Sequence, residues 1–193
     1  HDRDVLKTLA FPEIAFQVIY SWLANDIPLD DLRKISDESF NFSVPIVSVG
    51  EFQVLELFHG PTMAFKDFAA RFLARTMSYF AKRDHKTVTV VVATSGDTGG
   101  AVAEAFAELD GVRVVVLFPD KGVSDFQRQQ LTHVAANVQP VAVQGSFDDC
   151  QSLAKQALSD SSLSDISSAN SINVGRLIPQ IAYYVYTAAQ LGN

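Results

Sequence analysis

The sequence has only one cysteine, Cys150, among its 193 residues, so it can form no disulfide framework. This scarcity indicates a reducing compartment, and we expect a cytoplasmic location. No apolar run is long enough to span a bilayer, and neither end has the pattern of a secretory signal. The four histidines show no metal-ligand spacing. These absences argue against a disulfide-rich secreted domain, a membrane partner and a metal site.

Positive charge is also scarce, with 15 Lys and Arg against 22 Asp and Glu and a net charge of −7. Because the basic residues form no cluster, we expect no nucleic-acid partner. Hydrophobic residues make up 48% of the chain, and 14 of them are phenylalanine. The sequence therefore predicts a folded protein with a sizeable core rather than a disordered one.

Three short Val-rich runs alternate with helical patterns in the second half of the chain. The runs at residues 86–93, 112–118 and 138–143 are typical of strands, and we expect the first of them to be buried on both faces. Strands that alternate with helices at short spacing predict an open, mainly parallel α/β sheet with right-handed crossovers. Ligands of such sheets bind beyond the carboxyl ends of the strands.

The remaining segments are predicted from hydrophobic periodicity and turn signals. We expect helices in residues 1–39, broken near Pro28 and with Trp22 in the core, then strands within 42–58 that turn at Gly50. We expect a loop at 159–168 and a last helix at 176–190. This predicts three parts: residues 1–83 as a helical and β segment of a larger domain, 84–160 as a small α/β domain with three parallel strands, and 161–193 as a return segment and helix.

The stretch LFHGPTMAFKD, residues 57–67, contains the first candidate for chemistry. It turns at Gly60 and opens a helix at about Thr62, which places Lys66 in the first helical turn. The positive end of the helix dipole and apolar neighbours disfavour a charged amine, and a neutral lysine is a nucleophile. A surface lysine on an amphipathic helix is the alternative. Asp67 and Arg71, four residues apart, are predicted to pair.

The stretch TSGDTGG, residues 94–100, follows the first Val-rich strand and opens a helix. Backbone amides at a helix start, together with the hydroxyls of Thr94, Ser95 and Thr98, can bind an anion. The stretch matches neither the dinucleotide nor the P-loop glycine pattern. Because Gly and Asp are also common turn residues, an ordinary turn is the alternative.

A third polar stretch, ANSINVGR, spans residues 169–176 and precedes the last helix. Asn and Ser are common helix caps, so a capping role is the simpler interpretation. Arg176 adds a planar fork of donors that suits a phosphate group.

These three stretches, in this order, closely resemble the threonine synthase family of pyridoxal-phosphate enzymes, and the resemblance covers nearly the whole chain. It implies fold type II, the fold of the tryptophan synthase β chain, and conversion of O-phosphohomoserine and water to threonine and phosphate in threonine biosynthesis. It also implies roles for residues of this chain. Lys66 would carry pyridoxal 5'-phosphate, with Asp97 structural or facing the cofactor ring. Thr94, Ser95 and Thr98 would hold the substrate carboxylate. Asn170, Ser171 and Arg176 would hold its phosphate, with Asn173 close by.

One feature of the family is missing. Its cofactor phosphate lies in a Gly-Asn-Phe-Gly-type loop beyond the last helix of this chain, and Leu191-Gly192-Asn193 is not that loop. We therefore expect an internal piece of a longer enzyme that does not bind the cofactor tightly by itself. Two alternatives stay open: another lyase of the same fold type, such as a serine/threonine dehydratase or cysteine synthase, and a non-catalytic fragment that only binds a ligand. The oligomeric state is left open.

Overall fold

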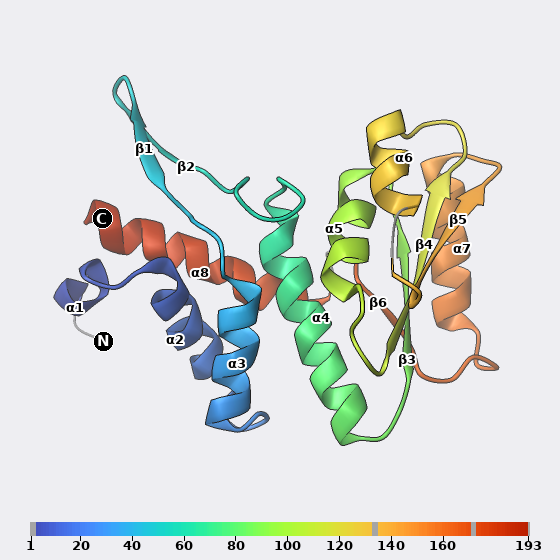
Figure 1. The fold of residues 1–193 in the computed structure, drawn as a ribbon, viewed down its shortest axis with the longest axis horizontal. Coiled ribbons are helices and arrows are strands. Elements are labelled where there is room, and N and C mark those ends of the chain that lie inside the picture. The colour runs from blue at the N-terminus through green and yellow to red at the C-terminus, as the bar shows by residue number, and fades with distance from the viewer. Residues whose placement is uncertain (1–2, 133–134, 171–172, 193) are drawn as a thin grey trace.

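The computed structural model describes residues 3–132, 135–170 and 173–192. Its first part contains α1 (Arg3–Lys7), α2 (Phe11–Leu23), α3 (Leu29–Ser39) and an antiparallel hairpin of β1 (Ile46–Val49) and β2 (Phe52–Leu55). The hairpin turns at Gly50, where φ is +60°, and projects away from the helices (Figure 1). The expected helices and strands are confirmed. The expected burial of Trp22 is wrong, since 58% of this residue is exposed beyond the buried stripe of α2, which ends at Ile19.

The second part is a four-stranded parallel sheet with the strand order β5-β4-β3-β6. The elements that build it and close the chain are α4 (Lys66–Arg83), β3 (Val88–Ala93), α5 (Asp97–Phe106), β4 (Val112–Pro119), α6 (Asp125–Thr132), β5 (Val138–Val143), α7 (Phe147–Ser159), β6 (Ile166–Ser168) and α8 (Val174–Leu191). The predicted parallel α/β sheet is confirmed. The loop expected at 159–168 is wrong for its last three residues, because β6 pairs with β3.

Helix α4 lies between the N-terminal helices and the sheet (Figure 1). One face carries Phe68 and Phe72, which pack with the helices of the first part and with α8. The opposite face carries Leu73 and Ala74, which pack beneath the sheet with α5. Because α4 is buried on both sides, its first residue, Lys66, lies where the two parts of the molecule meet.

Local signals in the sequence explain where the last two helices begin. Ser146 and Asp149 form a capping box at α7, with the Ser146 hydroxyl accepting from the Asp149 amide and the Asp149 carboxylate accepting from the Ser146 amide. At α8 the side chain of Asn173 accepts a hydrogen bond from the Gly175 amide.

Within the described residues, no helix is both long and apolar enough to cross a membrane. The cytoplasmic location stays a prediction.

Candidate active site

The helix that carries Lys66 begins at Lys66 itself. The start at about Thr62 that the sequence predicts is therefore wrong. The residues before it form a tight turn, in which the Met63 amide donates to the Gly60 carbonyl at 3.0 Å. Met63 has a φ of +55°, a left-handed conformation that a helix cannot contain. Lys66 is half-buried at the helix start, and its Nζ lies 4.8 Å from the centroid of the Phe65 ring.

The side chains of Asp67 and Arg71 form hydrogen bonds with other partners and not the predicted pair. The carboxylate of Asp67 accepts hydrogen bonds from Thr62, at the turn before the helix. The guanidinium of Arg71 donates to the carbonyls of Glu38 and Ser39 at the end of α3. The spacing of four residues places the two side chains on one helix face, but closer polar partners bind each of them.

The Gly-rich stretch connects the end of β3 to the start of α5. Thr94 is buried, and its hydroxyl accepts from the amides of Gly96 at 2.9 Å and Gly99 at 2.8 Å. Gly96 has a φ of +146°, and a Cβ on Gly99 would overlap the Thr94 side chain. These glycines therefore let the chain wrap around one hydroxyl, which holds the start of α5 in place. The first amides of a helix lack intrahelical acceptors, so this start can bind an anion.

The third stretch follows the end of β6, beside the Gly-rich stretch. Asn173 is engaged locally, because its amide nitrogen donates to the Ser168 carbonyl and its oxygen caps α8. Arg176 is 5% exposed and donates one hydrogen bond to the Ala169 carbonyl at 2.9 Å. Its Nε has no hydrogen-bond partner among the residues that the structure describes. Burial lowers the pKa of Arg176, since the charged form is desolvated.

A cleft of about 440 Å³ brings residues of all three stretches together. Its lining includes Lys66, Thr98, Asn170 and Arg176, which come from three segments far apart in the sequence. A volume of this size lies within the usual range of sites for small ligands. The amine, the hydroxyl, the amide and the buried guanidinium can together hold a small molecule with anionic groups.

The cleft also has lining residues that the sequence did not indicate: Phe65, Phe147, Gln151, Lys155 and Gln180. Three of them, Phe147, Gln151 and Lys155, recur every four residues and so form one face of α7. This spacing is visible in the sequence, but it is equally typical of any exposed helix face. Only the packing of α7 against the sheet identifies that face as part of a site.

Some of the predicted residues lie outside the cleft lining or outside the described chain. Ser95 is exposed in the loop after β3. Ser171 and the side chain of Asp97 are not among the parts that the structure describes.

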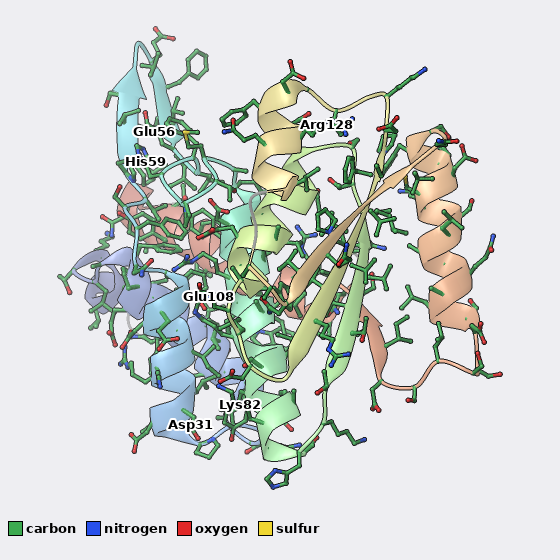
Figure 2. All side chains as sticks on the ribbon, turned by 45° about the vertical axis from the view of Figure 1, so that its right-hand side comes forward. Asp31, Glu56, His59, Lys82, Glu108 and Arg128 are labelled. Carbon is green, nitrogen blue, oxygen red and sulfur yellow. The ribbon has the colours of Figure 1, made fainter. Side chains whose placement is uncertain are left out.

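His59, between β2 and the turn, lies 2.6 Å from the Glu56 carboxylate, and Figure 2 shows the two side chains together below the hairpin. Among the described residues, no group of three or more His, Cys, Asp and Glu could hold a metal ion.

The match to known proteins agrees with this geometry. The family model described as pyridoxal-phosphate dependent enzyme matches residues 47–193. The chain belongs to this family. Membership confirms the predicted cofactor class, and the chain's parallel sheet with flanking helices is the fold-type II fold of these enzymes.

Among the members of this pyridoxal-phosphate family, the chain is similar to threonine synthases. It is 42% identical to that of Buchnera aphidicola subsp. Baizongia pistaciae over 91% of this chain and 42% of the relative. It is 41% identical to that of Escherichia coli over 97% of this chain and 44% of the relative. The crystal structure of pyridoxal-phosphate-bound threonine synthase from Brucella melitensis superposes with a TM-score of 0.90 at 38% identity, over 98% of this chain and 43% of the other. The resemblance noted in the sequence is confirmed, and the chain spans less than half the length of these relatives.

Proposed function

We propose that this chain forms the part of a threonine synthase that provides the cofactor lysine and the substrate-binding loops. The enzyme would act as a carbon–oxygen lyase on O-phosphohomoserine and release threonine and phosphate. The observation that supports this most directly is the cleft shared by Lys66, Thr98, Asn170 and Arg176. A substrate with a carboxylate at one end and a phosphate at the other needs two anion sites on either side of a reactive amine.

The residues that line the cleft suit this role in their chemistry, with an amine for the cofactor and a guanidinium, an amide and a hydroxyl for the anionic ends of the substrate. When bound, pyridoxal phosphate serves as the electron sink that makes carbon–hydrogen bonds near the substrate's amine acidic. In this proposal Lys66 attaches the cofactor and moves protons at Cα and Cβ of the substrate. The buried Nε of Arg176, which lacks a partner among the described residues, supports a role in holding an anion.

The remaining polar groups orient the substrate. Asn170 and Arg176 hold the phosphate that departs from Cγ, and Ser171 is proposed to join them. Thr98 and the first amides of α5 hold the carboxylate. After phosphate departs, Cγ takes up a proton to become the methyl group of threonine, and water adds at Cβ. Thr94 and Asn173, whose side chains bind within their own loops, contribute by keeping those loops in shape. Holding both ends of the substrate leaves only the bonds between them to rearrange.

A chimera tests the proposal, because the chain spans less than half of its relatives. The matching segment of the E. coli enzyme is replaced by residues 1–193 of this chain, and phosphate release from O-phosphohomoserine is compared with pyruvate formation from serine. We expect phosphate release without pyruvate, abolished by Lys66→Ala. Pyruvate formation would favour a serine/threonine dehydratase instead. A folded, cofactor-loaded chimera that forms neither product would overturn the proposal.

A further inference from the structure

The turn that leads into Lys66 is closed by a buried carboxylate. Asp67 Oδ2 accepts a hydrogen bond from the Thr62 amide at 2.9 Å, and Oδ1 accepts one from the Thr62 hydroxyl at 2.5 Å. The side chain of Asp67 has no exposed surface. Burial of a carboxylate is costly unless hydrogen bonds compensate it, and bonds to an ionised acceptor are the strong ones. The two bonds therefore hold Thr62 against the residue that follows Lys66.

The rest of the turn is shaped around this carboxylate. A Cβ on Gly60 would overlap the Asp67 side chain, so glycine leaves the space that the carboxylate fills. The Met63 amide donates to the Gly60 carbonyl at 3.0 Å, and the Asp67 amide donates to the Ala64 carbonyl at 3.0 Å. Met63 keeps its unusual φ of +55° within this arrangement. A residue in a strained conformation persists only where its surroundings fix it. For Met63 these surroundings include the two hydrogen bonds from Thr62 to the Asp67 carboxylate, which we call the Asp67 clamp.

The clamp is connected to the neighbouring helix. Arg71 lies one helical turn after Asp67 and is largely buried. It donates to the Ser39 carbonyl at 3.1 Å, the Glu38 carbonyl at 2.6 Å and the Asn41 side-chain oxygen at 2.9 Å. Through these bonds α4 is fixed to the end of α3. The start of α4 is thus held by Asp67 on the turn side and by Arg71 on the helix side.

We propose that Asp67 is the positioning residue for Lys66. By binding both donors of Thr62, it closes the turn and holds the lysine at the first position of α4, where the amine lines the cleft. Only the identity of the ligand that the Lys66 amine binds rests on the proposed function. The geometry of the turn does not depend on it.

Chemical labelling measures the position of the amine without any cofactor. The chain is treated with limiting acetic anhydride, and acetylation of each lysine is quantified by mass spectrometry, with exposed Lys34 as the internal reference. The variants are Thr62→Val, which removes the hydroxyl, Thr62→Ser, which restores it, and Asp67→Asn. Asp30→Asn is the matched control, because Asp30 is an exposed carboxylate in the first turn of α3.

Loss of one charge-assisted hydrogen bond shifts a local opening equilibrium by about tenfold. We therefore expect the ratio of Lys66 acetylation to Lys34 acetylation to change by about fivefold or more in Thr62→Val and Asp67→Asn. In Thr62→Ser and Asp30→Asn this ratio should stay near that of the parent. Circular dichroism verifies folding, and the Thr62 pair decides the result if Asp67→Asn does not fold. Equal ratios in the parent and Thr62→Val, or the same change in Thr62→Ser as in Thr62→Val, would overturn the inference. Borohydride trapping of pyridoxal phosphate on Lys66 is measured separately in the chimera, so a chimera that takes no cofactor counts against the proposed function alone.

Discussion

Replacement of Arg176 by methionine should make the chain more stable and should weaken its stabilisation by phosphate. Arg176 is 5% exposed, and among the described residues its guanidinium donates one hydrogen bond, to the Ala169 carbonyl, and forms no ion pair. Burial of a charge that is not compensated costs several kcal/mol, and this cost is consistent with the lowered pKa of Arg176. Methionine has a similar length without the charge, so it removes that cost.

The magnitude follows from opposing contributions. The substitution loses a charged hydrogen bond worth about 1.5–3 kcal/mol and leaves the Ala169 carbonyl without this donor. It removes a desolvation cost of several kcal/mol. We expect a net gain of about 1 kcal/mol in the free energy of unfolding, or a rise of about 2–4 °C in Tm for a chain of this size.

The assay is urea or thermal unfolding of the 193-residue chain with and without inorganic phosphate. If phosphate binds the parent with a dissociation constant on the order of 1 mM, then about 20 mM phosphate adds about 1.8 kcal/mol of stability. Arg176→Met should gain much less from phosphate. Arg113→Met is the matched control, because Arg113 is exposed on β4, and its phosphate response should equal that of the parent.

Two results would refute this reasoning. A loss of more than about 2 kcal/mol in the free energy of unfolding of Arg176→Met would show that the guanidinium mainly stabilises the fold through its hydrogen bond to the Ala169 carbonyl. An undiminished response to phosphate in Arg176→Met would show that the anion binds elsewhere. The first result would refute the stability argument, and the second would refute the proposed role of Arg176 in holding the substrate phosphate.

Two further predictions concern the scaffold of the site. Phe68 is fully buried and makes an edge-to-face contact with Phe42 at a centroid distance of 4.9 Å, so Phe68→Ala should cost about 4 kcal/mol in urea unfolding. Phe126→Ala, at a 57% exposed position, should change stability by less than about 0.5 kcal/mol, and equal effects of the two would contradict the packing of α4. The Ser146 amide lowers the pKa of the Asp149 carboxyl, so the capping contribution to stability is present above the usual pKa of aspartate and is lost as pH falls through the lowered one. Asp149→Asn, which has no carboxyl to titrate, should remove this part of the pH dependence of stability, and an unchanged acid limb in pH-dependent thermal unfolding would contradict the cap.

Much of the fold could be predicted from local patterns. The Val-rich run at β3 and the runs at β4 and β5 have the composition of buried parallel strands, and the structure places each of them within two residues of its predicted bounds. Ser146 before α7 is a cap that can be recognised from neighbouring residues alone. Such features depend on interactions within a few residues, so the sequence displays them directly.

Features that depend on distant partners could not be predicted in the same way. The run Ile-Ser-Ser at β6 is short and polar, and it is a strand only because the edge of β3 offers hydrogen bonds to it. Asp67 and Arg71 have the spacing of a helix pair, yet Thr62 and the end of α3 provide closer partners. Trp22 continues an apolar stripe on α2 but extends past the part of that helix that others cover.

The sequence by itself determined the kinds of groups at this site: an amine at a helix start, a Gly-rich turn after a strand, and an arginine behind an Asn-rich turn. Only the tertiary structure decided that they face one cleft. The pairing of β6 with β3 places Asn170 and Arg176 beside the Gly-rich turn, and the packing of α4 against both parts of the molecule adds Lys66. The physical reason is that strand pairing and helix burial are satisfied by whichever distant surface the folded chain presents, and no local pattern specifies that surface.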